Sequence, residues 1–349
     1  MKVDIIIPTY RPDDTFCLLL QKLQEQTFII HRIILMNTEE ALWEEAKRKY
    51  PIEQALRNLP CDYTLLHVSK EEFDHGATRM LGAAQSEADV IVFMTQDAMP
   101  ANPYLVANLV EPFVMESFQA DAEKEQAIDV EKTKRCQPED AKKTNKEAAT
   151  VAVAYARQLP REDCSVIECY TRQFNYPDAG RKKTKADIAE LGIKTFFCSD
   201  VCAAYRRDVF EKLGGFESPV IFNEDMFFAA RAIEADYAVE YRASACVVHS
   251  HNYSIKQQFR RNFDLAVSQT MHPEIFEEVS SESEGIKLVI NTMKHLVRIG
   301  KPYLIWNLGW QCVGKYAGYF MGKRYKRLTR KMILKCTMSP DYWKKIWRG

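Results

Sequence analysis

Short apolar segments alternate with longer amphipathic ones through residues 3–94, and this alternation constrains the fold more than any other feature of the chain. Strands are predicted at residues 3–7, 32–36, 63–68 and 90–94, and helices at residues 13–26, 41–50 and 77–86. The strand segments are mainly apolar and rich in β-branched residues, which is typical of strands buried on both faces. Strands and helices alternating at this spacing predict βαβ units and an α/β fold, a mostly parallel sheet flanked by helices.

Polar side chains gather where the predicted strands end. Thr9, Asn37, the EFDHG loop at residues 72–76 and Asp97 each follow a strand. Because ligands of parallel α/β sheets bind at the carboxyl ends of the strands, we expect these residues to share one site.

Asp97 is the acid that follows the apolar run VIVFM. A carboxylate at the mouth of a buried strand suits a divalent cation, Mg²⁺ or Mn²⁺, that would hold a diphosphate. The alternative is that Asp97 caps a helix before Pro100.

Asp225 lies in the sequence NED at the start of the amphipathic segment MFFAARAIEAD. Acids in a first helical turn are stabilised by the helix dipole, so capping alone explains this position. A carboxylate there is also well placed to take a proton from a hydroxyl nucleophile.

His249 and His251 follow the apolar run ACVV and are two residues apart. If the strand continues, both side chains point to the same side, where one of them could bind metal or phosphate. The alternative is that they are ordinary polar residues.

The order of these motifs resembles a known enzyme family. IIIPTY, FDHGATR, VIVFMTQDA, SDVCAAYRRDVFEKLGGF, NED and HSHNYSIKQQFRR follow one another over roughly residues 3–265. This ordered set is similar to the inverting nucleotide-sugar glycosyltransferases of family 2, and most similar to the bacterial rhamnosyltransferases. The resemblance implies a GT-A fold, which is a Rossmann-like, mostly parallel sheet.

The resemblance also implies roles for individual residues. Those expected to line the nucleotide sugar are Pro8, Thr9, Tyr10, Asn37, Glu39, Asp74, Gly76, Arg79, Thr95, Gln96, Asp200, Glu224, Gln258, Arg260 and Arg261. Asp225 matches the catalytic base, which would deprotonate the acceptor hydroxyl as that oxygen attacks the anomeric carbon, while metal and arginine stabilise the departing diphosphate.

Asp97 matches the last acid of the family's DxD metal motif, and His249 or His251 could complete the coordination. The sequence departs from the motif at Thr95, which stands where the first Asp is usual. A Thr hydroxyl ligates metal weakly or contacts the ribose instead, so we expect weaker metal affinity. The segment with Arg260 and Arg261 also lacks the Trp of the family's QxxRW element.

Charge is unevenly distributed along the chain. Lys+Arg and Asp+Glu both total 48, yet residues 286–349 hold 15 Lys/Arg and one acid, Asp341. Basic amphipathic helices with Trp and Tyr are typical of proteins on the anionic face of a bilayer. The alternatives are a solvated helical bundle or pairing with the acidic part of the chain in a homo-oligomer. Nucleic-acid binding is not favoured, because nothing upstream resembles a base-reading module.

These patterns divide the chain into a GT-A domain at residues 1–265 and a helical, basic region at residues 266–349. Within the first, residues 115–150 are highly charged and have little apolar surface, so we expect a solvated helical or mobile insertion. Residues 170–191 show neither a helix nor a strand pattern and are predicted to form a loop of mixed composition. The ten scattered cysteines and the absence of a leader favour reduced thiols and the cytoplasm, and no apolar run is long enough to span a membrane.

We therefore expect a cytoplasmic enzyme, peripheral at the inner face of the cell membrane. It would move a sugar, by resemblance L-rhamnose from dTDP-rhamnose, onto a lipid-linked or growing cell-surface polysaccharide. One alternative is a transferase that uses a UDP-hexose for teichoic acid or capsule. Another is a non-catalytic, membrane-docked adaptor that binds the nucleotide sugar.

Overall fold

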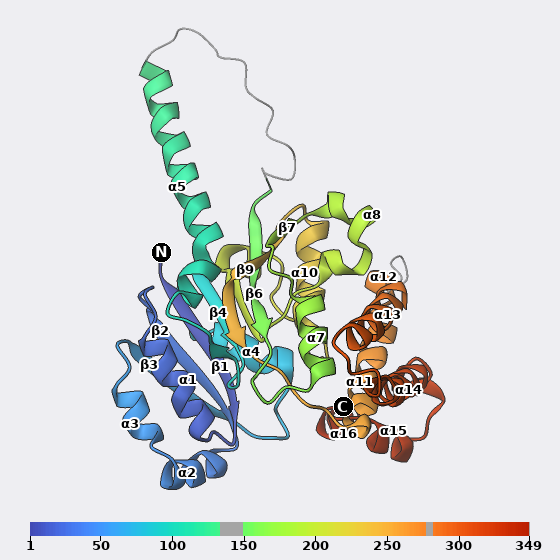
Figure 1. The fold of residues 1–349 in the computed structure, drawn as a ribbon. Coiled ribbons are helices and arrows are strands. Elements are labelled where there is room, and N and C mark those ends of the chain that lie inside the picture. The colour runs from blue at the N-terminus through green and yellow to red at the C-terminus, as the bar shows by residue number, and fades with distance from the viewer. Residues whose placement is uncertain (133–148, 277–281, 349) are drawn as a thin grey trace.

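The computed structural model describes residues 1–132, 149–276 and 282–348 (Figure 1). In this part of the chain nine strands form one sheet, in the order β3-β2-β1-β4-β8-β6-β9-β5, with β7 paired to β9. The strands are β1 (Val3–Tyr10), β2 (Arg32–Thr38), β3 (Asp62–Val68), β4 (Val90–Met94), β5 (Met99–Pro100), β6 (Val151–Leu159), β7 (Arg181–Lys183), β8 (Cys202–Arg206) and β9 (Ala238–Val248).

Helices flank this sheet and form the C-terminal region. Those before β8 are α1 (Asp14–Gln24), α2 (Glu40–Lys49), α3 (Ile52–Arg57), α4 (His75–Ala83), α5 (Leu105–Lys132), α7 (Val166–Asn175) and α8 (Ile188–Leu191). Those after it are α9 (Arg207–Lys212), α10 (Glu224–Glu234), α11 (Ile255–Met271), α12 (Pro273–Phe276), α13 (Glu282–Arg298), α14 (Leu304–Gly322), α15 (Arg330–Cys336) and α16 (Pro340–Arg348).

The sheet is mixed, and its N-terminal half is parallel. Strands β3, β2, β1 and β4 run parallel, whereas β8 is antiparallel to both β4 and β6, and β6 is parallel to β9. This arrangement confirms the predicted α/β fold class, a largely parallel sheet flanked by helices and followed by a helical C-terminal region. Thr9 pairs with Asn37 in the β1–β2 ladder, so the strand ends that carry the predicted site lie at one edge.

Helices cover both faces of the sheet. On one face α1, α2, α3 and α5 contribute residues such as Phe16, Trp43 and Leu109 to the core, and on the other α9 and α10 contribute Phe210, Phe227 and Phe228. Full burial of side chains of this size contributes about 1.5–3 kcal/mol each, so the two cores hold the strand ends in fixed positions.

The C-terminal helices attach through an unusually close contact between α11 and α14. Gly314, Gly318 and Gly322 are four residues apart and lie on one face of α14. A Cβ atom on Gly318 would lie 2.0 Å from the Phe259 carbonyl oxygen of α11. Because these glycines lack a Cβ, the two helix backbones approach closely, and α14 is fixed beside the start of α11.

Three predictions about organisation are refined by the structure. Helix α5 runs through the first part of the charged insertion to Lys132, and residues 133–148 lie outside the described residues. The predicted loop at residues 170–191 is wrong, because the end of α7, strand β7 and helix α8 occupy it. Strand β7 has the sequence RKK, and these three basic residues lack the apolar pattern by which a strand is predicted. Helix α11 crosses residue 265, and the division there stays a prediction.

Two further observations concern the whole described chain. None of its helices combines the length and the apolar character that crossing a bilayer requires. The cysteines among the described residues are all free thiols.

Candidate active site

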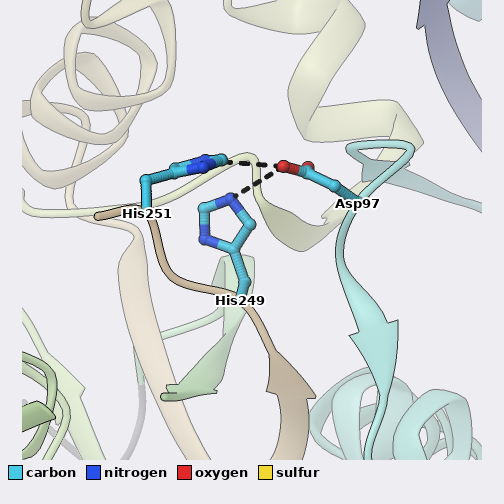
Figure 2. Close-up of side chains that lie close together, drawn as sticks. All are labelled: Asp97, His249 and His251. Carbon is cyan, nitrogen blue, oxygen red and sulfur yellow. Dashed lines mark ion pairs between the residues drawn. The ribbon is translucent and has the colours of Figure 1, made fainter. Parts of the chain in front are cut away.

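Asp97, His249 and His251 converge beyond the ends of β4 and β9 (Figure 2). Strand β5 pairs with β9 in a register that sets Met99 against Val248, and this pairing brings the loop of Asp97 to the histidines. His249 Nε2 lies 3.5 Å and His251 Nε2 3.4 Å from Asp97 Oδ2. The three ligand atoms all lie within 4.8 Å of one another, so the residue types and their spacing suit a bound cation.

Gln158 on β6 fixes the orientation of His249. The side-chain amide nitrogen of Gln158 donates to Tyr176 Oη and Ser199 Oγ, so its oxygen faces His249 Nδ1 at 3.1 Å. That oxygen accepts a hydrogen bond, and Nδ1 must therefore carry the proton when the imidazole is neutral. The lone pair of Nε2 then points toward the Asp97 carboxylate, an arrangement that is favourable only with a cation or a proton between them.

The protonation of this cluster also suits a cation. Burial raises the pKa of the Asp97 carboxyl, but the hydrogen bond and charge of His249 outweigh burial and hold that pKa well below its usual range. Burial and the neighbouring His249 lower the pKa of His251 to about 4. At neutral pH the cluster therefore offers an ionised carboxylate and a neutral His251 imidazole.

Thr95 and Gln96, the two residues before Asp97, contribute differently. Thr95 Oγ1 is buried with no hydrogen-bond partner of normal geometry, although it lies close enough to Asp97 to lower the pKa of that carboxyl. The Gln96 amide donates to the Tyr10 carbonyl over 3.0 Å and accepts from the Tyr10 N–H over 2.9 Å. Gln96 thus ties the loop after β4 to the end of β1.

A second cluster of charged residues lies at the start of α10. Arg79 of α4 places Nε 3.2 Å from Asp200 Oδ2 and Nη1 3.0 Å from Glu224 Oε1. All three side chains are buried, and Tyr205 Oη donates to the other Asp200 oxygen over 2.6 Å. Burial raises the pKa of Asp200 well above its usual range in spite of Arg79.

Asp225 lies next to this cluster, on the first turn of α10. Its Oδ2 accepts a hydrogen bond from the Asp200 N–H over 3.0 Å. Burial, with the negative charge of Glu224, raises the pKa of Asp225 to about 6. A carboxyl with this pKa is ionised at neutral pH and is a stronger base than an ordinary aspartate.

A cavity of about 470 Å³ lies at the carboxyl ends of β1, β2 and β4. Seven of the residues predicted to contact the nucleotide sugar line it, namely Pro8, Thr9, Tyr10, Asp74, Arg79, Thr95 and Gln96. Phe73 and His75, from the EFDHG loop expected at this site, line it as well. The wall also holds residues that sequence reasoning missed, namely Thr38, Lys70, Val220, Ile221, Met338, Ser339, Pro340, Asp341 and Tyr342. Five of these are consecutive and belong to the C-terminal region. No local pattern in the sequence indicates that these five residues reach the cavity.

Several predicted nucleotide contacts have structural partners of their own. Asn37 is buried and bonds to Thr9 Oγ1, the Glu39 carbonyl and His67, while the Glu39 carboxylate accepts from the Lys70 N–H. Both carboxylate oxygens of Asp74 are occupied, one by the Ala77 N–H and the other by the Val220 N–H.

Other predicted contacts lie away from the cavity wall. A Cβ atom on Gly76 would lie 2.0 Å from the Glu217 carbonyl oxygen, so close packing explains that glycine. Arg261 covers the Phe222 ring at 4.6 Å, and Arg260 lies near Asp264, whose pKa burial raises to about 6 in spite of the charge of Arg260. Asp200, Glu224 and Gln258 also lie outside the residues that line the cavity.

Comparison with known proteins gives relatives along nearly the whole chain. It is 32% identical over 348 residues to the O-antigen chain rhamnosyltransferase RfbN of Salmonella typhimurium, covering 99% of this chain and 97% of that protein. It is 34% identical over 294 residues to the O-antigen chain rhamnosyltransferase WbaN of Salmonella anatum, covering 83% of this chain and 82% of that protein. No protein-family model matches the chain.

Among solved structures, the fold is similar to that of the mannosyltransferase PcManGT of Pyrobaculum calidifontis, solved with GDP-Man and Mn²⁺. The TM-score is 0.50 at 15% identity, over 99% of this chain and 86% of that one. The fold and these relatives identify the chain as a glycosyltransferase with a GT-A type architecture. The chain belongs to the bacterial rhamnosyltransferase family that includes RfbN and WbaN.

Proposed function

We propose that the protein transfers L-rhamnose from dTDP-rhamnose, with inversion, to a lipid-linked or growing polysaccharide acceptor. The observation that carries this proposal is the separation of two functional clusters. Asp225, with its raised pKa, lies at the start of α10, whereas Asp97, His249 and His251 lie beyond β4 and β9. An inverting transfer needs a base on one side of the sugar and stabilisation of the leaving group on the other. The names of RfbN and WbaN support rhamnose as the sugar.

Asp225 acts as the base in this proposal. Its carboxylate accepts the proton of the acceptor hydroxyl as that oxygen forms a bond to the anomeric carbon, and the bond from that carbon to the phosphate oxygen breaks. The nucleoside diphosphate leaves with the bonding electron pair, and the proton stays on Asp225. The Asp200 N–H holds the carboxylate in position throughout.

Asp97, His249 and His251 would hold the divalent ion, Mg²⁺ or Mn²⁺. Two imidazoles and one carboxylate suit Mn²⁺ better than Mg²⁺, which prefers oxygen ligands. Bound there, the ion would neutralise charge that develops on the departing diphosphate. The Mn²⁺ complex of PcManGT supports a divalent ion on this fold.

The nucleotide would occupy the cavity of about 470 Å³ at the ends of β1 and β4. Tyr10, Phe73 and Tyr342 offer aromatic surface to a base, and Lys70 offers a positive charge. The donor is tested by calorimetry and by nucleotide release with dTDP-rhamnose, UDP-glucose and UDP-galactose, with and without Mn²⁺. We expect turnover of dTDP-rhamnose alone and tighter binding with Mn²⁺. Turnover of a UDP-hexose would favour the alternative donor, and nucleotide binding without turnover or metal enhancement would favour an adaptor.

We further propose that α13 and α14 dock on the anionic cytoplasmic face of the membrane, where a lipid-linked acceptor would be reached. Trp306 is 76% and Trp310 50% exposed, and Tyr303 and Tyr316 are also exposed. Exposed basic residues accompany them, namely Lys294, Arg298, Lys301, Lys323 and Arg324. Exposed aromatic and basic side chains on and beside two consecutive helices suit the interface of an anionic bilayer. The free thiols of the described cysteines support the cytoplasm.

Co-sedimentation with vesicles tests this docking. Replacing Trp306 and Trp310 together by Ser should lower binding to vesicles of phosphatidylglycerol and phosphatidylethanolamine by about tenfold. Phe118→Ser is the control, because Phe118 is an equally exposed aromatic residue on α5. Equal binding by the double variant and the control would contradict docking through α14.

A further inference from the structure

A second cavity, of about 190 Å³, lies beside the Asp97–His249–His251 cluster and has no role in the scheme above. Its wall is made by the start of α7, the segment that follows β9, the first turn of α11 and one face of α14. From α14 it receives Leu304, Asn307 and Gln311, which recur at helical spacing and so share a face. The close packing of Gly318 on Phe259 fixes this face against α11.

Gln258 is the feature that indicates a ligand. This residue of α11 is 7% exposed and lines the cavity, yet its side-chain amide makes no hydrogen bond to any described residue. Its backbone carbonyl alone has a partner, Asn262. Buried amides in native proteins are almost always hydrogen-bonded, so an amide that is free and faces a cavity indicates a polar group that binds there.

The wall of the cavity combines apolar side chains, from Val166, Ile167 and Leu304, with polar ones, of which Glu168 is the one carboxylate. The Gln311 amide donates to Asn307 Oδ1 over 2.7 Å, which leaves the Asn307 NH₂ and the Gln311 oxygen free for a ligand. Glu168 is paired with Arg172 at 2.8 Å, and no Lys or Arg side chain lines the cavity. Amides that both donate and accept suit sugar hydroxyls, and the Tyr253 ring offers an apolar surface for a sugar face. Without a cation in the wall, a phosphate group is disfavoured.

We propose that this cavity binds one neutral sugar residue of the acceptor saccharide, with Gln258, Asn307 and Gln311 as its hydrogen-bonding groups. The proposal rests on the proposed transferase function and adds the location and chemistry of an acceptor subsite. His251 joins the two sites, because it lines this cavity while its Nε2 lies 3.4 Å from Asp97. Asn307 and Gln311 also neighbour the exposed Trp306 and Trp310 in α14, so one helix carries both the saccharide contacts and the proposed membrane contacts.

Saturation-transfer NMR with simple glycosides tests the subsite without requiring turnover. The probes are the methyl glycosides of L-rhamnose, D-mannose and D-galactose, each added to the full-length protein with its donor cavity saturated by dTDP. At least one glycoside should bind, and Gln258→Leu, Asn307→Ala and Gln311→Ala should each weaken that binding by about fivefold or more. Gln54→Ala, which removes an exposed amide on α3, should leave it unchanged.

Two results would overturn the proposal: no glycoside binds the wild type, or binding survives in all three variants. Calorimetry with dTDP-rhamnose on the same proteins separates this failure from failure of the proposed function. If the subsite alone is wrong, dTDP-rhamnose still binds and is turned over. If the proposed function is wrong, the wild type itself fails to use that donor. Thermal unfolding of each variant checks that lost binding does not reflect lost folding.

Discussion

The backbone N–H of Asp200 donates to Asp225 Oδ2 over 3.0 Å, and this bond orients the carboxylate that we propose as the base. Burial and Glu224 raise the pKa of Asp225 to about 6, and only the ionised form can accept a proton. Transfer should therefore be slow below pH 6 and rise to a plateau above it. Measuring kcat from pH 4.5 to 8.5 at saturating donor checks this. Glu224→Gln should move the midpoint to lower pH, and an unchanged midpoint near pH 4 in both proteins would contradict the assignment.

Arg79 should be essential for stability, because it compensates two buried acids. Its side chain and those of Asp200 and Glu224 are almost fully buried, with contacts of 3.2 and 3.0 Å. Arg79→Met leaves both acids without a cation and should lower the free energy of unfolding at pH 7 by about 3–5 kcal/mol.

Urea unfolding measures this effect, with Arg57→Ala as the control. Arg57 also pairs with an acid, Glu53 at 3.5 Å, but both side chains are exposed. An exposed pair of this kind contributes at most about 1 kcal/mol. Equal losses in the two variants would contradict the view that Arg79 is held by buried charge.

Gln158 should control metal affinity although it is no ligand. Its oxygen fixes the tautomer of His249 over 3.1 Å, so that Nε2 faces Asp97. Gln158→Leu should weaken Mn²⁺ binding by about 10- to 100-fold, the usual effect of losing such a partner, and His249→Ala should weaken it at least as much. Electron paramagnetic resonance titration of Mn²⁺ reports the dissociation constant. Wild-type affinity in both variants would place the ion elsewhere.

The C-terminal segment should contribute to nucleotide binding. Residues 338–342 line the larger cavity, and Asp264 of α11 holds them by accepting from Thr337 Oγ1 over 2.6 Å and from the Met338 N–H over 2.7 Å. Thr337→Val removes the first of these bonds and should weaken dTDP binding by about three- to tenfold. Calorimetry provides the measurement. Thr329→Val, at the start of α15, loosens a cap outside the cavity and should have no effect on dTDP.

Local patterns in the sequence predicted the parallel half of the sheet well. Strand β4 spans the predicted residues 90–94, whereas β1 begins at Val3 as predicted but continues to Tyr10, beyond the end of its apolar run. The convergence of Thr9 and Asn37 also followed, because parallel strands end at one edge. The spacing of His249 and His251 was consistent with a shared direction, but their contact with Asp97 depends on the pairing of β5 with β9, across more than 140 residues.

The rest of the site could not be predicted, because long-range packing creates it. Nothing near Tyr342 shows that this residue reaches the ends of β1 and β2, since its position is set by Asp264 on another helix. The cavity beside Gln258 likewise forms only because α14 packs against α11. That packing depends on Gly314, Gly318 and Gly322, whose close approach to α11 the sequence does not reveal. The basic composition of the C-terminal region predicted a role at the membrane surface. It gave no indication that residues 338–342 line the cavity.

Single-turnover transfer by Asp225→Asn tests the central claim most directly. The substitution keeps the shape of the side chain and removes its ability to accept a proton. With dTDP-rhamnose, Mn²⁺ and a membrane extract containing lipid-linked acceptor, we expect the transfer rate to fall by about 100-fold or more, while the dissociation constant of dTDP-rhamnose stays at the wild-type value. Transfer at the wild-type rate would show that Asp225 is not the base and would contradict the account of this site.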